Sequence, residues 1–221
     1  MQQYMEVLKN TKIFAGLGED DITAMLNCLN ARIKTYKKGG LVLCQGEISS
    51  KILILLEGNL HIQSDDYWGN RTILSKISVG EMFGEAYALP ESGEVINDVS
   101  ALEDSKVMLF DIDRVLSVCP SACRFHSAVI ENLFSAISEK NRILVQKLSV
   151  ISKRTTREKL ISYLSGEAKR NNSPVFDIPF NRQQLADFLS VDRSAMSNEL
   201  CKMRDEGLLE FNKNHFKLLL N

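Results

Sequence analysis

Residues 80–105, GEMFGEAYALPESGEVINDVSALEDS, repeat Gly-Glu pairs in a pattern that could wrap around a small molecule. Glycine-rich turns let backbone N–H groups approach an anion closely. After Gly84 and Glu85, however, the chain has no Arg or Lys until Lys106. The stretch is therefore either a phosphate pocket that lacks its cation or a pocket for another kind of molecule.

The cysteines and histidines could also do chemistry, but their spacing predicts no metal site. The five cysteines are an odd number and are scattered, which does not indicate a disulfide framework. Cys119 and Cys123 have a C-x3-C spacing that could hold a metal or form a redox switch. No second Cys or His pair stands nearby to complete four ligands, so two thiols at a helix start are the better interpretation. The three histidines are isolated.

Composition and charge indicate the class of protein and the number of its domains. The chain has 221 residues, 44% of them hydrophobic and 25% charged, which is typical of a globular protein with one large or two smaller domains. No apolar run approaches the roughly 18 residues that span a bilayer, and the N-terminus does not read as a secretory signal, so we expect a cytoplasmic protein. Residues 1–118 carry 11 basic and 17 acidic side chains (net −6), and residues 119–221 carry 16 and 11 (net +5). The sequence predicts two domains, of which only the second suits a polyanion.

The first of these regions, after a short helix at GEDDITAMLNCL, runs over residues 32–112 and alternates short β-rich runs with glycine turns. The turn signals recur at intervals of roughly 8–14 residues, which is typical of an antiparallel sandwich or jelly roll. An α+β protein with this region at its N-terminal end is predicted.

Residues 121–164 contain neither Gly nor Pro and predict a long helix followed by a second, basic one. The apolar residues of the long helix follow a heptad with Asn141 at an a position, and such an Asn fixes register and favours two strands. We predict a dimer seam; the alternative is a helix that packs only on its own domain. The seam consists of Phe134, Ile137, Asn141, Leu144, Leu148 and Ile151.

The last part of the chain predicts a helix-turn-helix followed by a wing. PVFDIPF is expected to form a strand pair, and Asn181 then caps a helix with Gln184 in a capping box. Asp192 caps the next helix, which Gly207 ends. LLEFNKNHFKLLL predicts a β-hairpin, the wing of such a domain.

The order of these parts resembles the Crp/Fnr superfamily of bacterial transcription factors. The likeness rests on GEMFGE in the β-rich region, the long helix, and FNRQQLADFLSVDRSAMSNELCKMRDEGLL. It implies a cyclic-nucleotide-binding-like β-roll at residues 1–120, a dimerisation helix at 121–152 and a winged helix-turn-helix at 153–221. It also implies a homodimer that binds double-stranded DNA and works with RNA polymerase.

The resemblance also implies which residues meet DNA. Family members read bases from positions that fall here on Arg193, Ser194, Ser197 and Asn198, and the position of Arg182 usually touches phosphate. The four lie on one face at the N-terminal end of a recognition helix, the end that enters the major groove. Arg193 could pair with guanine or bind phosphate. Many relatives have Glu and Arg where this chain has Ser194 and Asn198, so a different preferred DNA sequence is expected; Ser190 also replaces a common turn glycine.

The expected effector pocket departs from the pattern of relatives that bind cyclic AMP. Relatives that bind cyclic AMP follow the Gly-Glu pair with an Arg-Ser pair that holds the phosphate, and the alignment from Gly84 and Glu85 places Val95 and Ile96 there. We therefore predict that cyclic AMP is not the effector. A less charged molecule, an organic acid met by a residue such as Arg142, or no effector at all remain. The first 27 residues contain no cysteine for an iron–sulfur centre, and the cofactor is unknown.

Two other functional classes are weaker. Jelly-roll enzymes need clustered His and carboxylate ligands, usually with an H-x-H pair, and His61 stands alone in the β-rich region. We therefore predict no catalytic residues and no enzyme. A nucleotide-binding regulatory subunit that acts on a protein partner without DNA is the alternative, and the basic rear half counts against it.

Overall fold

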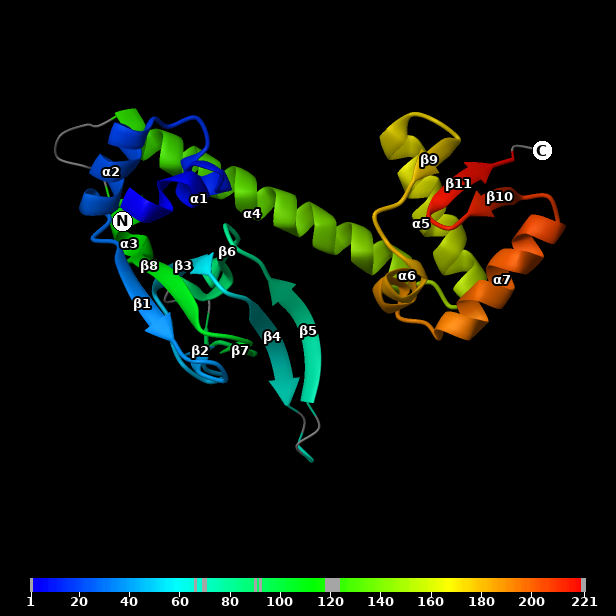
Figure 1. Cartoon of the computed structure of the whole chain (residues 1–221), viewed down its shortest axis with the longest axis horizontal. Helices are drawn as coiled ribbons and strands as arrows, with labels where there is room; N and C mark the ends of the chain where they lie inside the picture. Colours follow the sequence, from blue (N-terminus) through cyan, green and yellow to red (C-terminus); the bar gives the residue numbers. More distant parts are fainter. Residues whose placement is uncertain are drawn as a thin grey trace. The chain divides into compact units, whose positions relative to one another are not determined.

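The computed structural model describes residues 2–65, 67–68, 71–89, 91, 93–117 and 124–219. The chain forms two compact units, Met1–Ser138 and Glu139–Asn221, and one long helix, α4, runs from the first into the second. Figure 1 shows the strands β1 to β8 gathered in the first unit and a smaller three-stranded sheet in the second. Each unit is described below by itself.

The first unit opens with short helical segments that cover one side of the strands. Leu8, Ile13, Phe14 and Ile22 of these segments are fully buried. Glu19, Asp20 and Asp21 lie in the first turn of α2, where negative charge favours the helix start, and Gly18 N donates to Asp21 Oδ2 at 3.3 Å. The segments are η1 (Gln2–Tyr4), α1 (Met5–Lys9), η2 (Lys12–Phe14) and α2 (Glu19–Cys28).

Eight strands form the predicted antiparallel β-roll as two four-stranded sheets, in the orders β1-β8-β3-β6 and β2-β7-β4-β5. Among the described residues of this unit, every strand pairing is antiparallel, which confirms the prediction. A short helical turn, η3 (Glu85–Tyr87), follows β6, and α3 (Ile112–Leu116) follows β8. The strands are β1 (Arg32–Tyr36), β2 (Leu41–Leu43), β3 (Lys51–Glu57), β4 (Leu60–Asp65), β5 (Arg71–Ile77), β6 (Met82–Phe83), β7 (Asp98–Ala101) and β8 (Ser105–Asp111).

Strand β3, KILILLE, is buried on both faces, which explains why its sequence does not alternate between apolar and polar residues. Ile52, Ile54 and Leu56 belong to the core under the helices, which we call the helix-side core. Leu53 and Leu55 belong to a second core with residues of both sheets, the inter-sheet core. The sheet that contains β3 is thus a layer between two separate apolar clusters, and the inter-sheet core lies between the two sheets of the β-roll.

Helix α4 (Arg124–Ile151) completes the helix-side core with its first half. Val129, Leu133 and Ala136, spaced four and three residues apart, are all buried there. Asn132 Nδ2 donates to the carbonyls of Ile13 and Ala15, at 3.2 and 2.9 Å. The start of the long helix is therefore part of the first unit.

The second unit contains a helix-turn-helix with a wing, as predicted. Thr155 caps α5, and the strands β10 and β11 pair antiparallel as the predicted hairpin. PVFDIPF does not form the expected strand pair: it contributes the single strand β9, which pairs with β11. Pro179 lacks the N–H that a second strand at this position would donate. The elements are α5 (Thr156–Asn171), β9 (Val175–Asp177), α6 (Arg182–Leu189), α7 (Arg193–Asp205), β10 (Leu209–Asn212) and β11 (His215–Leu218).

Candidate nucleic-acid interface and effector pocket

Side-chain caps fix the starts of α6 and α7. Asn181 Oδ1 accepts from Gln184 N at 2.9 Å, and Gln184 Oε1 accepts from Asn181 N at the same distance, which is the predicted capping box. At α7, Asp192 Oδ1 accepts from Ala195 N at 2.8 Å and from the hydroxyl of Ser194. The Ser194 hydroxyl and then the Ala195 amide hold the pKa of Asp192 below its ordinary value. The first turn of α7 is therefore held in a defined geometry.

The structure brings the four predicted base-reading residues together on the outward face of α7. Arg193, Ser194 and Asn198 are exposed and Ser197 is half-buried. The opposite face, with Met196, Leu200 and Met203, is buried in the core of the second unit. Ser197 Oγ donates to the Arg193 carbonyl at 2.9 Å. The polar face is thus available at the N-terminal half of the helix.

Arg182, predicted to touch phosphate, lies against the wing. Its guanidinium carbon is 4.7 Å from the centroid of the Phe211 ring and 5.3 Å from that of Phe216. Burial lowers the pKa of Arg182 below its ordinary value. The aromatic rings therefore position this cation at the start of α6.

A groove of about 690 Å³ opens between the starts of α6 and α7 and the turn of the wing. It includes both arginines of the predicted interface, together with Lys213 at the wing turn, where φ is +53°. Sequence reasoning missed Lys213, although the NKN turn between two strands was a signal that a cation stands at the wing tip. The lining residues are Pro179, Phe180, Asn181, Arg182, Gln183, Gln184, Arg193, Lys213 and Asn214.

The predicted effector-pocket residues, Gly84, Glu85, Val95 and Ile96, differ in burial. Gly84 has φ of +81°, and a Cβ there would lie 2.5 Å from Leu53 Cδ1, so this position requires glycine. Glu85 begins η3. Val95 is 1% exposed and belongs to the inter-sheet core, whereas Ile96 is 64% exposed.

Lys106, the first basic residue after Gly84 and Glu85 in the sequence, has other partners. Lys106 Nζ donates to Tyr4 Oη at 3.0 Å and lies 3.1 Å from Glu57 Oε2. The hydrogen bond with Tyr4, and then that with Glu57, raises the pKa of Lys106. Lys106 thus ties the N-terminal segment to β3 and β8. Arg142, the other candidate cation, is exposed on α4 in the second unit.

The predicted heptad residues of α4 face outward. Phe134 is 73% exposed and Leu144 and Leu148 are 64% and 61% exposed, whereas Val150 on another face is buried. Ile137 and Asn141 are also exposed, and Ile151 is half-buried. An apolar stripe therefore runs along the helix on the side that neither core uses.

The remaining residues that could do chemistry are the cysteines and the possible metal ligands. Cys28 is exposed, Cys44 and Cys201 are half-buried, and burial raises the pKa of the Cys44 thiol. Cys119 and Cys123 lie outside the described residues. Among the residues that are described, no cluster of His, Cys, Asp or Glu could hold a metal ion, and none of their helices is long and apolar enough to cross a membrane.

Comparison with known proteins matches both halves of the chain. Residues 33–121 match the cyclic nucleotide-binding domain, and residues 158–220 match the Crp-like helix-turn-helix domain. The cyclic AMP receptor protein of Thermus thermophilus is 22% identical over 202 residues, which cover 91% of this chain and 89% of that protein. The cGMP-dependent protein kinase 2 of Homo sapiens is 27% identical over 114 residues, 51% of this chain but 14% of the kinase. The crystal structure of the Thermus thermophilus catabolite activator protein has a TM-score of 0.51 at 19% identity, covering 95% of this chain and 94% of that one.

Proposed function

Because the chain belongs to the Crp/Fnr superfamily of bacterial transcription regulators, we propose that it acts as a homodimer that reads double-stranded DNA and senses a small effector. The observation that carries the proposal is the outward polar face of α7 beside a groove with Arg182 and Lys213. By family resemblance, RNA polymerase is the further partner.

The base-reading residues are Arg193, Ser194, Ser197 and Asn198. They share one face at the N-terminal half of α7, the part of a recognition helix that reaches base edges in the major groove. Arg193 can pair with O6 and N7 of guanine, and Asn198 can pair with adenine. Serine discriminates bases less strongly than arginine does.

The groove beside α7 suits the DNA backbone. Its basic residues are Arg182, Arg193 and Lys213, and the start of α6 contributes backbone N–H groups where the helix dipole favours an anion. Phosphate contacts of this kind fix the register of a protein on the duplex and carry no sequence information directly.

The homodimer forms through the apolar stripe of α4. A coiled-coil seam buries a and d residues against a second helix, and Phe134, Leu144 and Leu148 occupy such positions while largely exposed in one chain. Asn141, at an a position, favours two helices in register.

The β-roll senses a molecule other than cyclic AMP. Moving a cyclic phosphate out of water without a paired cation costs several kcal/mol, and Val95 is an apolar core residue at the position where relatives have arginine. A less charged molecule would avoid that desolvation cost.

Selection of DNA from a random library by the full-length protein tests the DNA-reading proposal. The selected sites should be near-palindromic, with half-sites about one helical turn (roughly 34 Å) apart.

Arg193→Ala should cost about 1–3 kcal/mol of specific binding and relax one base position in each half-site. Arg204→Ala, at the far end of the same helix, is the control and should leave the selected sequence unchanged. If no sequence is enriched by the wild-type protein, the proposal is wrong; an equal loss on all sequences for Arg193→Ala would make it a phosphate contact.

A further inference from the structure

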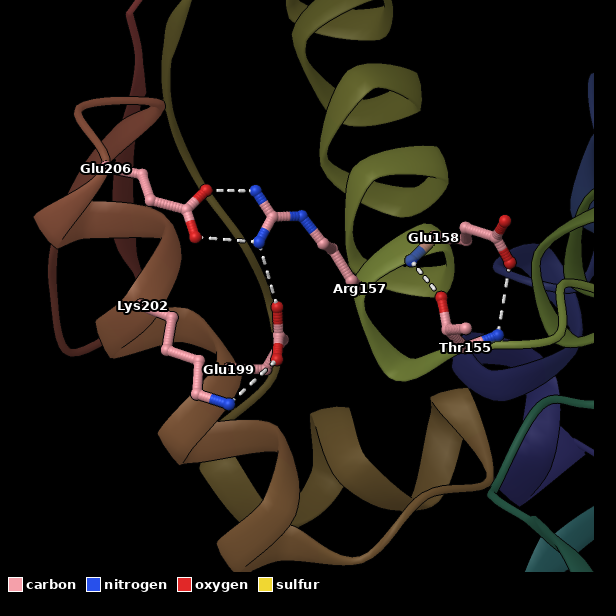
Figure 2. Close-up of polar contacts among 6 residues, drawn as sticks. All are labelled: Thr155, Arg157, Glu158, Glu199, Lys202 and Glu206. Carbon is pink, nitrogen blue, oxygen red and sulfur yellow. Dashed lines mark hydrogen bonds and ion pairs between the residues drawn. The ribbon is translucent and has the colours of Figure 1, made fainter.

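Arg157, in the first turn of α5, connects that helix to α7 (Figure 2). Its Nη1 lies 3.0 Å from Glu206 Oε1, and its Nη2 bonds the second oxygen of the same carboxylate. The same Nη1 is 3.3 Å from Glu199 Oε1. One guanidinium thus binds two carboxylates of the helix that carries the base-reading face.

The two carboxylates stand far apart along α7. Glu199 lies in the middle of the helix, directly after Asn198, and Glu206 caps its C-terminal end seven residues later. That interval is about 10 Å along a helix axis. Because Arg157 forms a two-pronged bond with Glu206 and also reaches Glu199, it restricts both the sliding and the rotation of α7.

The other side of the contact is also fixed. Thr155 Oγ1 accepts from Glu158 N, and Glu158 Oε2 accepts from Thr155 N, both at 3.1 Å, so the start of α5 is held by a capping box. Two residues after Arg157, Lys159 Nζ donates to the carbonyls of Leu189 and Ser190 at 3.0 and 3.3 Å. The first turn of α5 therefore contacts both α7 and the turn that precedes it.

We propose that Arg157 is a positioning residue for DNA reading, which sets α7 through Glu199 and Glu206 and does not itself contact DNA. Its guanidinium is engaged by the two carboxylates, and its side chain is 35% exposed. The inference rests on the proposed function, because α7 must be the helix that reads DNA.

A positioning role for Glu206 and a purely electrostatic role predict opposite effects on DNA binding. One substitution at Glu206 therefore distinguishes the two roles. A carboxylate near DNA repels phosphate, so Glu206→Gln should strengthen binding if only charge matters. If Glu206 positions α7 through Arg157, the same substitution should weaken binding to the selected site, although it removes a negative charge.

The test uses the full-length protein and the DNA site that the wild-type protein selects. Affinities for that site and for an unrelated duplex are measured over a range of salt concentrations for Arg157→Gln, Glu206→Gln and the double variant. Asp205→Asn is the matched control, since Asp205 is the neighbouring carboxylate and pairs with Arg204 instead. Thermal unfolding of each variant shows that it is folded.

Each single variant should bind the selected site about fivefold to tenfold more weakly, and the double variant no more weakly than the worse single. The affinity for unrelated DNA should change less than about twofold, and the salt dependence should keep its slope, because no phosphate contact is lost. Asp205→Asn should bind as well as the wild type or better.

Two outcomes would overturn the inference. Tighter binding by Glu206→Gln would show that only charge matters, and a slope reduced by about 0.9 in Arg157→Gln would make Arg157 a phosphate contact. A wild-type protein that selects no DNA site would instead refute the proposed function, and the inference with it.

Discussion

At the scale of single residues, left-handed backbone conformations end both helices of the DNA-reading motif. Gly207, with φ of +75°, ends α7, and the amides of Gly207 and Leu208 bond the carbonyls of Arg204 and Met203 at 2.9 and 3.0 Å. Ser190 ends α6 with φ of +51°, although it carries a Cβ. A left-handed conformation costs a non-glycine residue roughly 1–2 kcal/mol. Lys159, which binds the carbonyl of Ser190, offsets part of that cost.

Replacing Ser190 with glycine should therefore stabilise the protein. We expect Ser190→Gly to raise the free energy of unfolding by about 0.5–1 kcal/mol, because relief of the backbone strain exceeds the extra entropy of glycine in the unfolded chain. Denaturant titration of the full-length protein measures the change.

The matched control is Ser149→Gly in the ordinary helical backbone of α4, which should lower the free energy of unfolding by about 0.5 kcal/mol. A destabilised Ser190→Gly variant would show that the left-handed turn carries no strain at this position.

At the scale of elements, α4 uses different faces for different purposes. Its first half buries Val129 and Leu133 in the helix-side core, and its end buries Val150 in the core of the second unit. The heptad face, with Leu144 and Leu148, is exposed. A helix that keeps an exposed apolar face after packing on the cores of its own chain is typical of a helix that packs against a second chain.

If the proposed dimer forms, Leu144→Glu should make the protein monomeric at micromolar concentration. A charge at a d position would be buried without a partner in the seam, and that desolvation is costly. Sedimentation velocity in the absence of DNA measures the mass of the particle. Ile143→Glu is the control, because Ile143 is 49% exposed but lies outside the heptad positions. A dimeric Leu144→Glu variant, or a monomeric wild type, would contradict the proposed seam.

The elements of the fold could be predicted from local patterns. The caps at Asn181, Asp192 and Gly207 act within four residues of the chain, so the sequence alone placed the ends of α6 and α7. The same holds for the turn glycines that separate the strands. The strand pair expected in PVFDIPF was wrong because the partner of β9, strand β11, lies about 40 residues further along the chain.

The candidate site could be predicted only in part. The family resemblance implied Arg193 and Asn198 as base-reading residues, and helical periodicity alone places them on one face of α7, where both are exposed. The contact of Arg157 with Glu206 joins residues 49 apart, and the stacking of Arg182 on Phe211 joins the start of α6 to the wing. No local pattern encodes such contacts. The burial of Val95 and the pairing of Lys106 with Glu57 likewise depend on how the two sheets and the N-terminal helices pack.

At the scale of the whole molecule, the two parts of the chain carry net charges of opposite sign. Residues 1–118 carry a net charge of −6 and residues 119–221 one of +5. Because long-range attraction to DNA depends on net charge, the second part favours the proposed DNA binding and the first part opposes it. A negatively charged effector would likewise meet an unfavourable field in the first part.

Isothermal titration with cyclic AMP and cyclic GMP should give no saturable binding in the micromolar range. The absence of a forked cation at Val95 should weaken the affinity by about a hundredfold or more relative to a paired site, since several kcal/mol of desolvation stay uncompensated. The protein sample must bind its selected DNA, which shows that it is folded. A dissociation constant in the low micromolar range for either nucleotide would refute the prediction.

Helix α4 also limits how this regulator could exchange parts with others during evolution. The match to the sensor domain ends at residue 121, but Val129, Leu133 and Ala136 fill the core beneath the first sheet. A sensor transferred without them would leave incomplete the core that also contains Ile52, Ile54 and Phe110, and the smaller buried apolar area would lower its stability. The unit that could be transferred between proteins is therefore larger than the matched domain, because it includes the first half of α4.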